Sequence, residues 1–327
     1  MTEAAEILTV IPCLNEEQHL EKLVLSLVDA NRDLPMRIVI ADGRSTDRTP
    51  EIAQNLAKQH ANVVYLNNPK RIQAAALNLA VANCGDGAEF LIRIDAHADY
   101  PSNYCRMLIE EAEKTKAASV VVAMNTVGTG WFQRAAAAAQ NSKLGHGGSA
   151  HRNADGSGKW VDHGHHALMR IDAFREVGGY DESFSHNEDA ELDTRLGRAG
   201  HKIWLTGETA ITYYPRSSRG PLFRQYMQYG YGRARNIFKN KTLPKLRQLV
   251  PAAVLPAILL LLVSPFIRIA ALPFWLWCAF CLGYGIKLAI DTKDTSIAAA
   301  GPVAMIMHSG WSFGFWKAVL DKLQGKI

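Results

Sequence analysis

The sequence predicts an α/β protein with a mostly parallel sheet flanked by helices, followed by C-terminal transmembrane helices. In the first half of the chain, short apolar segments alternate with amphipathic stretches, which is typical of βαβ units. Near the C-terminus, two apolar runs are each about as long as the ~20 residues that cross a bilayer. The 327 residues, 48% of them hydrophobic, suffice for one large domain or two smaller ones.

The expected elements follow one another regularly up to residue 124. Five apolar runs are predicted strands, and the amphipathic stretches between them are predicted helices, with Ser45 or Thr46 as a helix N-cap. The strands are Ile7–Leu14, Arg37–Ala41, Val63–Leu66, Phe90–Ile94 and Ser119–Met124, and the helices are Glu17–Ala30, Thr46–Gln59, Ile72–Asn83 and Ser102–Thr115. A later helix is expected over Asp189–Ala199. Parallel strands joined in this way end at a common edge of the sheet.

The C-terminal third predicts a transmembrane hairpin. Leu249–Ile267 is apolar apart from Ser264, and Ile269–Ile290 is apolar apart from Lys287. The alternative is a very apolar core hairpin. A third run, 297–320, either spans, re-enters or lies in the interface. We therefore expect an N-terminal domain over residues 1–215, a basic amphipathic neck over 216–248 and a membrane region over 249–327.

The charge distribution is strongly asymmetric. Residues 209–327 hold 15 basic and 3 acidic residues, a net of +12, so the formal net charge of +5 leaves −7 for residues 1–208. A basic neck beside apolar runs is typical of contact with anionic lipid headgroups rather than nucleic acid. Basic flanks belong on the cytoplasmic side. No cleavable signal precedes Ile7, so we expect the N-terminal domain in the cytoplasm of a bacterial inner-membrane protein. The five cysteines have no paired spacing, which indicates reduced thiols.

Polar side chains follow the ends of several predicted strands or open the late helix. They are Asn15, Glu16, Glu17, Asp42, Asp95, His97, Glu188 and Asp189. Ligands of open α/β sheets bind past the carboxyl ends of the strands, and oxygen and nitrogen donors there suit a divalent metal beside phosphate. Each residue alone could belong to a solvated turn or a helix N-terminus. Together they predict a site for a nucleotide diphosphate and a metal. The absence of GxGxxG and GxxxxGK[ST] argues against a dinucleotide fold and a phosphate-loop NTPase.

The order of these motifs resembles the family 2 glycosyltransferases. The matching segments are Val10–Glu17, Ala41–Asp47, Asp95–His97, Gly178–Glu182 and Asn187–Asp189. The resemblance implies the GT-A fold and an inverting enzyme that uses a nucleotide sugar. Within the family, the chain is most similar to membrane-anchored transferases of bacterial exopolysaccharide assembly, such as those that build succinoglycan.

The resemblance also implies roles for individual residues. Asp189 matches the acid that deprotonates the acceptor hydroxyl, with Glu188 beside it. Asp95 and His97 occupy the positions that hold Mn²⁺ or Mg²⁺ against the pyrophosphate. The residues expected to bind the nucleotide sugar are Pro12, Asn15, Glu16, Glu17, Asp42, Arg71, Asn78, Asp95 and Arg233.

Two departures from the family pattern refine the expectation. The family usually has a second aspartate at position 97, and the imidazole of His97 suits Mn²⁺ better than Mg²⁺. Segment 224–233 lacks the QxxRW motif of processive synthases, which indicates transfer of one sugar per acceptor.

The predicted reaction moves a hexose, glucose by family resemblance, from a UDP-sugar to a hydroxyl of a polyprenyl-diphosphate-linked oligosaccharide. One alternative is a polyprenyl-phosphate glycosyl synthase, and another is a non-catalytic membrane protein that binds nucleotide sugar. The Gly- and His-rich segment 145–166 is expected to be a mobile segment near the acceptor, with a second metal site as the alternative.

Overall fold

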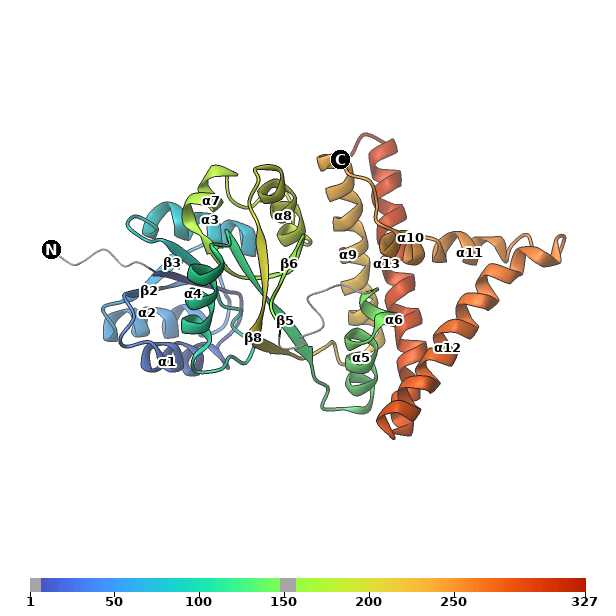
Figure 1. Cartoon of the computed structure of the whole chain (residues 1–327), viewed down its shortest axis with the longest axis horizontal. Helices are drawn as coiled ribbons and strands as arrows, with labels where there is room; N and C mark the ends of the chain where they lie inside the picture. The colour runs from blue at the N-terminus through green and yellow to red at the C-terminus, as the bar shows by residue number, and fades with distance from the viewer. Residues whose placement is uncertain (1–6, 148–156) are drawn as a thin grey trace. The chain divides into compact units, whose positions relative to one another are not determined.

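The computed structural model describes residues 7–147 and 157–327. The chain forms two compact units (Figure 1). Among the described residues, the first comprises 7–124 and 157–211, and the second comprises 125–147 and 212–327. The segment 125–147 thus belongs with the C-terminal region, whereas the sequence pattern assigned it to the N-terminal domain.

The first unit is built on an eight-stranded sheet in the order β3-β2-β1-β4-β7-β5-β8-β6. Its strands are β1 (Ile7–Cys13), β2 (Met36–Asp42), β3 (Val63–Asn67), β4 (Phe90–Arg93), β5 (Ser119–Thr126), β6 (Lys159–Val161), β7 (His165–Arg170) and β8 (Ile203–Tyr213). The four strands β3, β2, β1 and β4 are parallel neighbours, as the βαβ pattern predicts. β7 is antiparallel to both β4 and β5, and β6 is antiparallel to β8.

Helices cover the sheet on both faces. They are α1 (Leu20–Ala30), α2 (Thr49–Gln59), α3 (Gln73–Cys84), α4 (Tyr104–Thr115), α7 (Ile171–Glu176) and α8 (Glu188–Arg198). Residues of β1 alternate between two apolar clusters, with Ile7 and Ile11 in one and Leu8 and Val10 in the other. Burial on both faces explains why the strands appear in the sequence as continuous apolar runs.

Two predicted helices begin three residues later than the sequence suggests. α1 starts at Leu20 and α2 at Thr49, and the N-cap of α2 is Arg48 rather than Ser45 or Thr46. The predicted cap is wrong because Ser45 and Thr46 bond to Asn15 across the strand ends instead.

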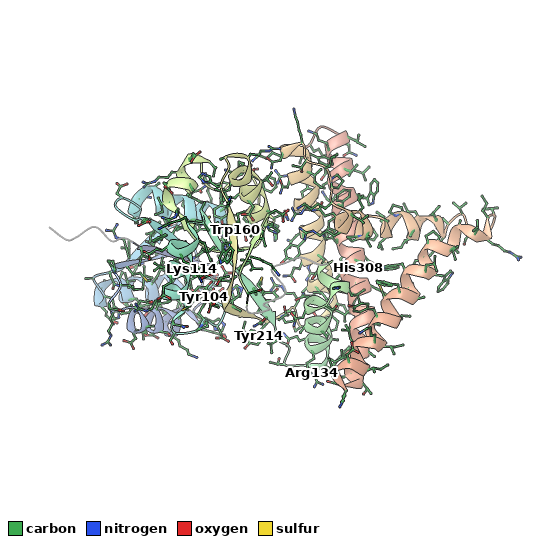
Figure 2. All side chains as sticks on the ribbon, in the orientation of Figure 1. Tyr104, Lys114, Arg134, Trp160, Tyr214 and His308 are labelled. Atoms are coloured by element: carbon green, nitrogen blue, oxygen red, sulfur yellow. The ribbon has the colours of Figure 1, made fainter. Side chains whose placement is uncertain are left out.

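The second unit is helical. It contains α5 (Trp131–Asn141), α6 (Lys143–His146), α9 (Arg219–Asn240), α10 (Leu246–Ala252), α11 (Val254–Leu260), η2 (Arg268–Ala271), α12 (Leu272–Thr292), η3 (Thr295–Ala299) and α13 (Ala300–Leu323). His308 of α13, labelled in Figure 2, joins three of these segments. Its Nε2 donates to the Leu144 carbonyl at 2.8 Å, and its Nδ1 accepts from Trp277 Nε1 at 3.2 Å.

The first predicted transmembrane run, 249–267, is not a single helix. α10 ends at Ala252, α11 ends at Leu260, and i→i−3 hydrogen bonds follow over 261–264. Pro251 and Pro256 interrupt this segment because proline lacks the N–H that a continuous helix requires. Among the described residues, one helix, Arg268–Thr292, is long and apolar enough to cross a membrane. The expectation of several transmembrane helices is therefore not supported.

Glycines allow α9 and α13 to approach closely. A Cβ atom on Gly314 would lie 1.8 Å from the Met227 carbonyl oxygen, and one on Gly310 would lie 2.5 Å from that of Phe223. Since 223 precedes 227 and 310 precedes 314, the two helices run parallel. Their close contact leaves no room for a larger side chain.

We expect Gly314→Ala to destabilise the second unit by about 1–3 kcal/mol, because overpacking forces the two backbones apart. Thermal unfolding of the full-length protein in detergent measures the effect as a lowered Tm. Gly283→Ala on α12 is the matched control, since a Cβ there meets no heavy atom within 4 Å. Equal Tm values for the two variants would contradict the close packing.

Candidate active site

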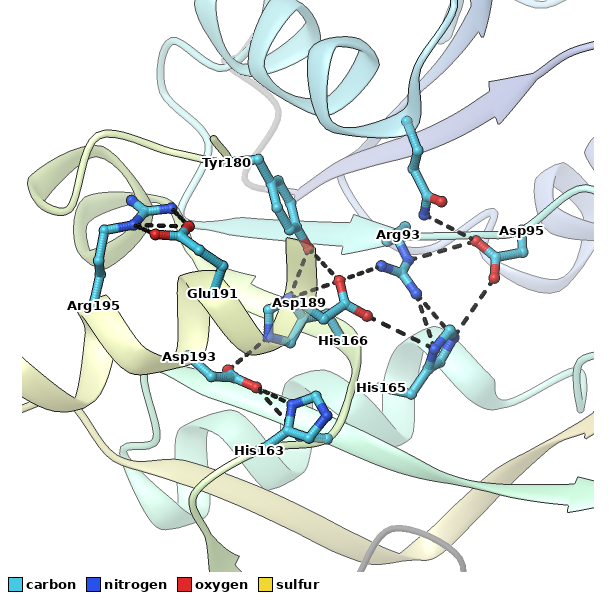
Figure 3. A network of polar contacts seen from close by, with 12 residues as sticks. Arg93, Asp95, His163, His165, His166, Tyr180, Asp189, Glu191, Asp193 and Arg195 are labelled. Atoms are coloured by element: carbon cyan, nitrogen blue, oxygen red, sulfur yellow. Dashed lines mark hydrogen bonds and ion pairs between the residues drawn. The ribbon is translucent and has the colours of Figure 1, made fainter. Parts of the chain in front are cut away.

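One buried guanidinium joins two of the predicted site residues. Arg93, at the end of β4, has a side chain only 3% exposed, and its Nη1 donates to Asp189 Oδ1 at 2.8 Å. Its Nε lies 3.5 Å from Asp95 Oδ1, and its Nη2 lies 3.0 Å from the ring nitrogens of His165. Figure 3 shows Arg93 between the two carboxylates. The predicted metal-side acid and the predicted base therefore share one cation.

Histidines of β7 and the turn before it contact the same face of α8. Asp189 Oδ1 accepts from the Tyr180 hydroxyl at 3.2 Å and lies 3.4 Å from His166 Nδ1. The other ring nitrogen of the fully buried His166 lies 2.7 Å from Asp193 Oδ1. Asp193 Oδ2 lies 2.9 Å from His163 Nδ1 (Figure 3). Positions 189 and 193 are four residues apart, so both carboxylates point toward β7.

The pKa values of this cluster diverge. Burial raises the pKa of Asp189, but Arg93 and His166 outweigh it, so the net shift is downward and the carboxylate stays ionised. Burial and then the adjacent Asp189 charge raise the pKa of Glu188 to about 7. Burial and then Arg93 lower the pKa of His165 to about 4, so its imidazole is neutral. For His166, burial lowers the pKa, but Asp193 and Asp189 outweigh it and the net shift is upward.

We expect Glu188→Gln to change how stability depends on pH. Oε2 of Glu188 is buried without a hydrogen-bond partner among the described residues. Its folded pKa of about 7 lies above the ordinary 4.5, so between these values the unfolded chain binds fewer protons than the folded one. The wild-type free energy of unfolding therefore falls as pH rises through this window, and E188Q lacks that part of the fall.

Urea unfolding from pH 4.5 to 8 measures this difference. Glu113→Gln, exposed on α4, is the control and should follow the wild type. Parallel curves for wild type and E188Q would mean that the Glu188 carboxyl is not held in its protonated form.

Three predicted nucleotide-binding residues after β1 bind the loop after β2. The Asn15 side-chain oxygen accepts from Thr46 N at 2.8 Å, and Glu17 Oε2 accepts from Arg48 N at 3.0 Å. The Glu16 amide donates to the Thr49 hydroxyl at 2.8 Å. These contacts fix the loop at the carboxyl edge of the sheet. Direct contact of Asn15, Glu16 and Glu17 with a nucleotide remains a prediction.

Asp42 and Pro12 lie at the neighbouring ends of β2 and β1. Asp42 is 1% exposed, and its carboxylate accepts from Ser45 N at 3.2 Å and from the Tyr65 hydroxyl at 3.5 Å. Pro12 is half-buried and pairs in register with Ala41. Both are therefore at the predicted edge.

The remaining predicted nucleotide contacts occupy three different settings. Arg71 is exposed, has a φ of 62° and lies beside Gly43 at the end of β2. Asn78 instead binds the backbone of Tyr180 through both amide atoms, at 2.8 Å to its carbonyl oxygen and 2.9 Å from its N–H. It thereby holds the turn that carries Tyr180. Arg233 lies on α9 in the second unit, and its role remains a prediction.

Asp95 and His97 are suited to hold a divalent metal together with phosphate oxygens. The partners of the Asp95 carboxylate lie at 3.4–3.6 Å, longer than ordinary hydrogen bonds. His97 is held through Nδ1 by Glu16 Oε1 at 3.0 Å, and ligating histidines are commonly oriented by such a carboxylate. Within residues 7–147 and 157–327, no group of three or more His, Cys, Asp or Glu could hold a metal ion by itself. The alternative of a second metal site in segment 145–166 is therefore not supported in its described part, and residues 148–156 lie outside the described residues.

Sequence reasoning missed Arg93, His165, His166, Tyr180 and Asp193 as site residues. Arg93 offered one signal, since a charged residue within the apolar run of a buried strand requires a partner. The histidines were noticed only as part of a glycine-rich segment. They lie beside Arg93 because β7 pairs between β4 and β5, and this strand order is not visible in the sequence.

The sequence matches a known family and two characterised relatives. The Glycosyl transferase family 2 profile matches residues 9–178. The chain is 54% identical over 314 residues to succinoglycan biosynthesis protein ExoA of Rhizobium meliloti, covering 96% of this chain and 95% of that protein. It is 25% identical over 322 residues to a dolichyl N-acetyl-α-D-glucosaminyl phosphate 3-β-D-2,3-diacetamido-2,3-dideoxy-β-D-glucuronosyltransferase of Methanococcus voltae, covering 95% of this chain and 96% of that one.

Solved structures confirm the GT-A-like fold. Mannosyltransferase PcManGT from Pyrobaculum calidifontis, solved with GDP-Man and Mn²⁺, superposes with a TM-score of 0.60 at 17% identity, over 97% of this chain and 88% of that one. GalNAc-T7, solved with UDP, GalNAc and Mn²⁺, has a TM-score of 0.51 at 16% identity, over 65% of this chain and 44% of that one. With the family profile and a 54%-identical relative spanning nearly the whole chain, this protein is a glycosyltransferase that belongs to family 2.

Proposed function

We propose that the chain transfers a hexose, glucose by analogy, from a UDP-sugar to a hydroxyl of a polyprenyl-diphosphate-linked oligosaccharide, once per acceptor, in exopolysaccharide or related surface-glycan assembly. The observation that carries the proposal is the shared contact of Asp95 and Asp189 with Arg93. Through this contact, Asp95, proposed to lie beside the diphosphate of the donor, is next to Asp189, proposed to lie beside the hydroxyl of the acceptor. The 54% identity to a succinoglycan biosynthesis protein supports this class of product.

Each residue has a distinct part in the proposed reaction. Asp189, ionised because Arg93 and His166 lower its pKa, accepts the proton of the acceptor hydroxyl as the new glycosidic bond forms. Glu188 lies beside it on the first turn of α8. In the same displacement the bond between the anomeric carbon and the diphosphate oxygen breaks and UDP leaves, and attack opposite this leaving group inverts the anomeric centre. Asp95 and His97 would hold Mn²⁺ or Mg²⁺, which supplies positive charge against the diphosphate when bound.

The acceptor fits a membrane setting. The basic neck 216–248 and the apolar helix Arg268–Thr292 support attachment to anionic headgroups on the cytoplasmic face of a bacterial inner membrane. A second candidate function, polyprenyl-phosphate glycosyl synthesis, is favoured by the low pKa of Asp189, which makes it a weak base. A phosphate acceptor is already ionised and needs no base.

A screen of radiolabelled nucleotide sugars against membrane lipid extracts tests the proposal. We expect label from a UDP-hexose to enter the lipid fraction in the presence of Mn²⁺ or Mg²⁺. Transfer into a lipid monophosphate would favour the second candidate. If no nucleotide sugar is either transferred or hydrolysed, the enzymatic proposal is wrong.

We expect His97→Asp to shift the metal preference from Mn²⁺ toward Mg²⁺, because oxygen ligands suit Mg²⁺ better than imidazole does. Titrating transfer activity with each metal measures the shift as a change in the ratio of half-saturating concentrations. His60→Asp, distant in sequence at the end of α2, controls for the added charge. An unchanged ratio in H97D would remove His97 from the metal site.

A further inference from the structure

We propose that residues 254–292 form a hairpin that enters and leaves the bilayer from the same side, while α13 does not cross it. The inference rests on the membrane attachment proposed above. According to this inference, one hairpin makes all the contact with the hydrocarbon. The C-terminus then lies on the same side of the membrane as α9.

The hairpin carries a continuous apolar surface. Between Val254 and Tyr284 the only charged residue is Arg268. Side chains from both arms are exposed, including Leu262 at 74%, Phe266 at 87%, Ile269 at 72% and Trp275 at 62%. Only 17% of the most apolar part of Arg268–Thr292 is buried. A helix that is apolar around most of its circumference and exposed to this extent requires a hydrocarbon surrounding rather than water.

The two feet of the hairpin are both fastened to α13. At the first foot, the Ala252 carbonyl oxygen accepts from Ser312 Oγ at 2.9 Å and from Trp316 Nε1 at 2.8 Å. At the second foot, Gly285 lies so close to α13 that a Cβ on it would be 2.6 Å from Gly301 N. One helix, α13, holds both feet, and because α13 stays outside the hydrocarbon for the reason given below, both arms start from the same side of the membrane.

The first arm is too short to cross alone. α11 has seven residues, a rise of about 10 Å. The residues up to Ile267 add at most about 14 Å even with the greater rise of a 3₁₀-helix. The sum is less than the ~30 Å of a hydrocarbon core. From its foot at Gly285 back to Arg268 the second arm has 18 residues and a length of about 27 Å, and the long Arg268 side chain can extend from the tip toward polar headgroups.

α13 is tied to a helix that cannot enter the hydrocarbon. It runs parallel to α9 through the glycine contacts at 310 and 314, and the Tyr231 hydroxyl donates to Asp321 Oδ2 at 3.0 Å. α9 carries five basic residues, which are Arg219, Arg224, Arg233, Arg235 and Lys239. Each would cost about 2.5–3.5 kcal/mol at the centre of a bilayer. The α9–α13 pair therefore stays outside the hydrocarbon, and its basic residues suit the anionic surface below the hairpin.

Cysteine labelling of the full-length protein tests the topology. Phe266→Cys reports on the hairpin tip, and Leu323→Cys, 79% exposed at the end of α13, is its matched probe. With a membrane-impermeant maleimide, we expect inside-out vesicles to label L323C and to leave F266C unlabelled. The parent protein, whose five cysteines are buried or half-buried, gives the background.

Three results would overturn the inference. These are labelling of L323C in intact spheroplasts, labelling of F266C in inside-out vesicles, and recovery of the protein in the soluble fraction, which would indicate a protein partner for the apolar surface. Glycosyl transfer is measured on the same vesicles. Transfer with the wrong labelling pattern overturns only the hairpin, whereas correct labelling without transfer from any nucleotide sugar overturns only the proposed function.

Discussion

Asp189→Asn is expected to lower kcat by about 10²–10⁴-fold with little change in KM for the nucleotide sugar. The asparagine keeps the shape of the side chain and can still accept from Arg93 and Tyr180, but it cannot take a proton from the acceptor. Steady-state transfer to a lipid-linked acceptor measures the loss. Asp86→Asn, whose side chain is 98% exposed, should retain wild-type kcat.

The same variant separates the two candidate reactions. If D189N transfers sugar at nearly the wild-type rate, the acceptor does not need deprotonation and the chain acts on an ionised phosphate. In that case the low pKa of Asp189 serves to keep a fixed negative charge beside Arg93. A large loss of kcat supports a hydroxyl acceptor. Because D189N lacks one of the charges around Arg93, its fold should be checked by thermal unfolding before the rates are compared.

Arg93→Met is expected to destabilise the first unit by about 3–5 kcal/mol. The guanidinium is buried between Asp95 and Asp189, and its loss leaves two carboxylates without their shared cation. Urea unfolding measures the effect. Arg106→Met is the matched control, because the ion pair of Arg106 with Asp33 is exposed and contributes about 1 kcal/mol or less. Similar losses in the two variants would contradict a central role for Arg93.

Arg93→Lys distinguishes two roles of Arg93, which are to hold the Asp189 side chain in position and to supply a positive charge. Lysine keeps the positive charge but lacks the planar fork that reaches Asp95, Asp189 and His165 together. If Arg93 positions Asp189, R93K recovers much of the stability lost in R93M while kcat stays low and KM for the donor is little changed. If R93K restores kcat fully, charge alone is sufficient.

The sequence predicted the parallel half of the sheet well. In the sequence, β1 to β4 are recognisable as apolar runs and the helices between them as amphipathic stretches. The reason is that each strand buries both faces and each helix buries one. Asp42, Asp95 and Asp189 were found for a similar reason, since polar groups directly after a buried strand or at a helix start stand out locally. The helix starts at α1 and α2 were less accurate, because Asn15 and Thr46 bond across the sheet edge rather than within one segment.

For the C-terminal apolar region too, the sequence predicted some features and not others. Local composition identified the apolar segments, since hydropathy is a sum over neighbouring residues. Whether 249–267 continues as one helix depends on Pro251, Pro256 and the contacts of Ala252 with α13. Those contacts join residues about sixty positions apart and leave no periodic signal.

By itself, the sequence determined that this protein has an α/β domain, a family 2 glycosyltransferase motif order and an apolar C-terminal region. The tertiary structure decided that β7 lies between β4 and β5, and so brought His165 and His166 to Arg93 and Asp189. The physical reason is that strand order is set by long-range pairing and packing, whereas periodicity reports only how each segment is buried. A buried cation such as Arg93 requires partners, but only the assembled sheet determines which carboxylates they are.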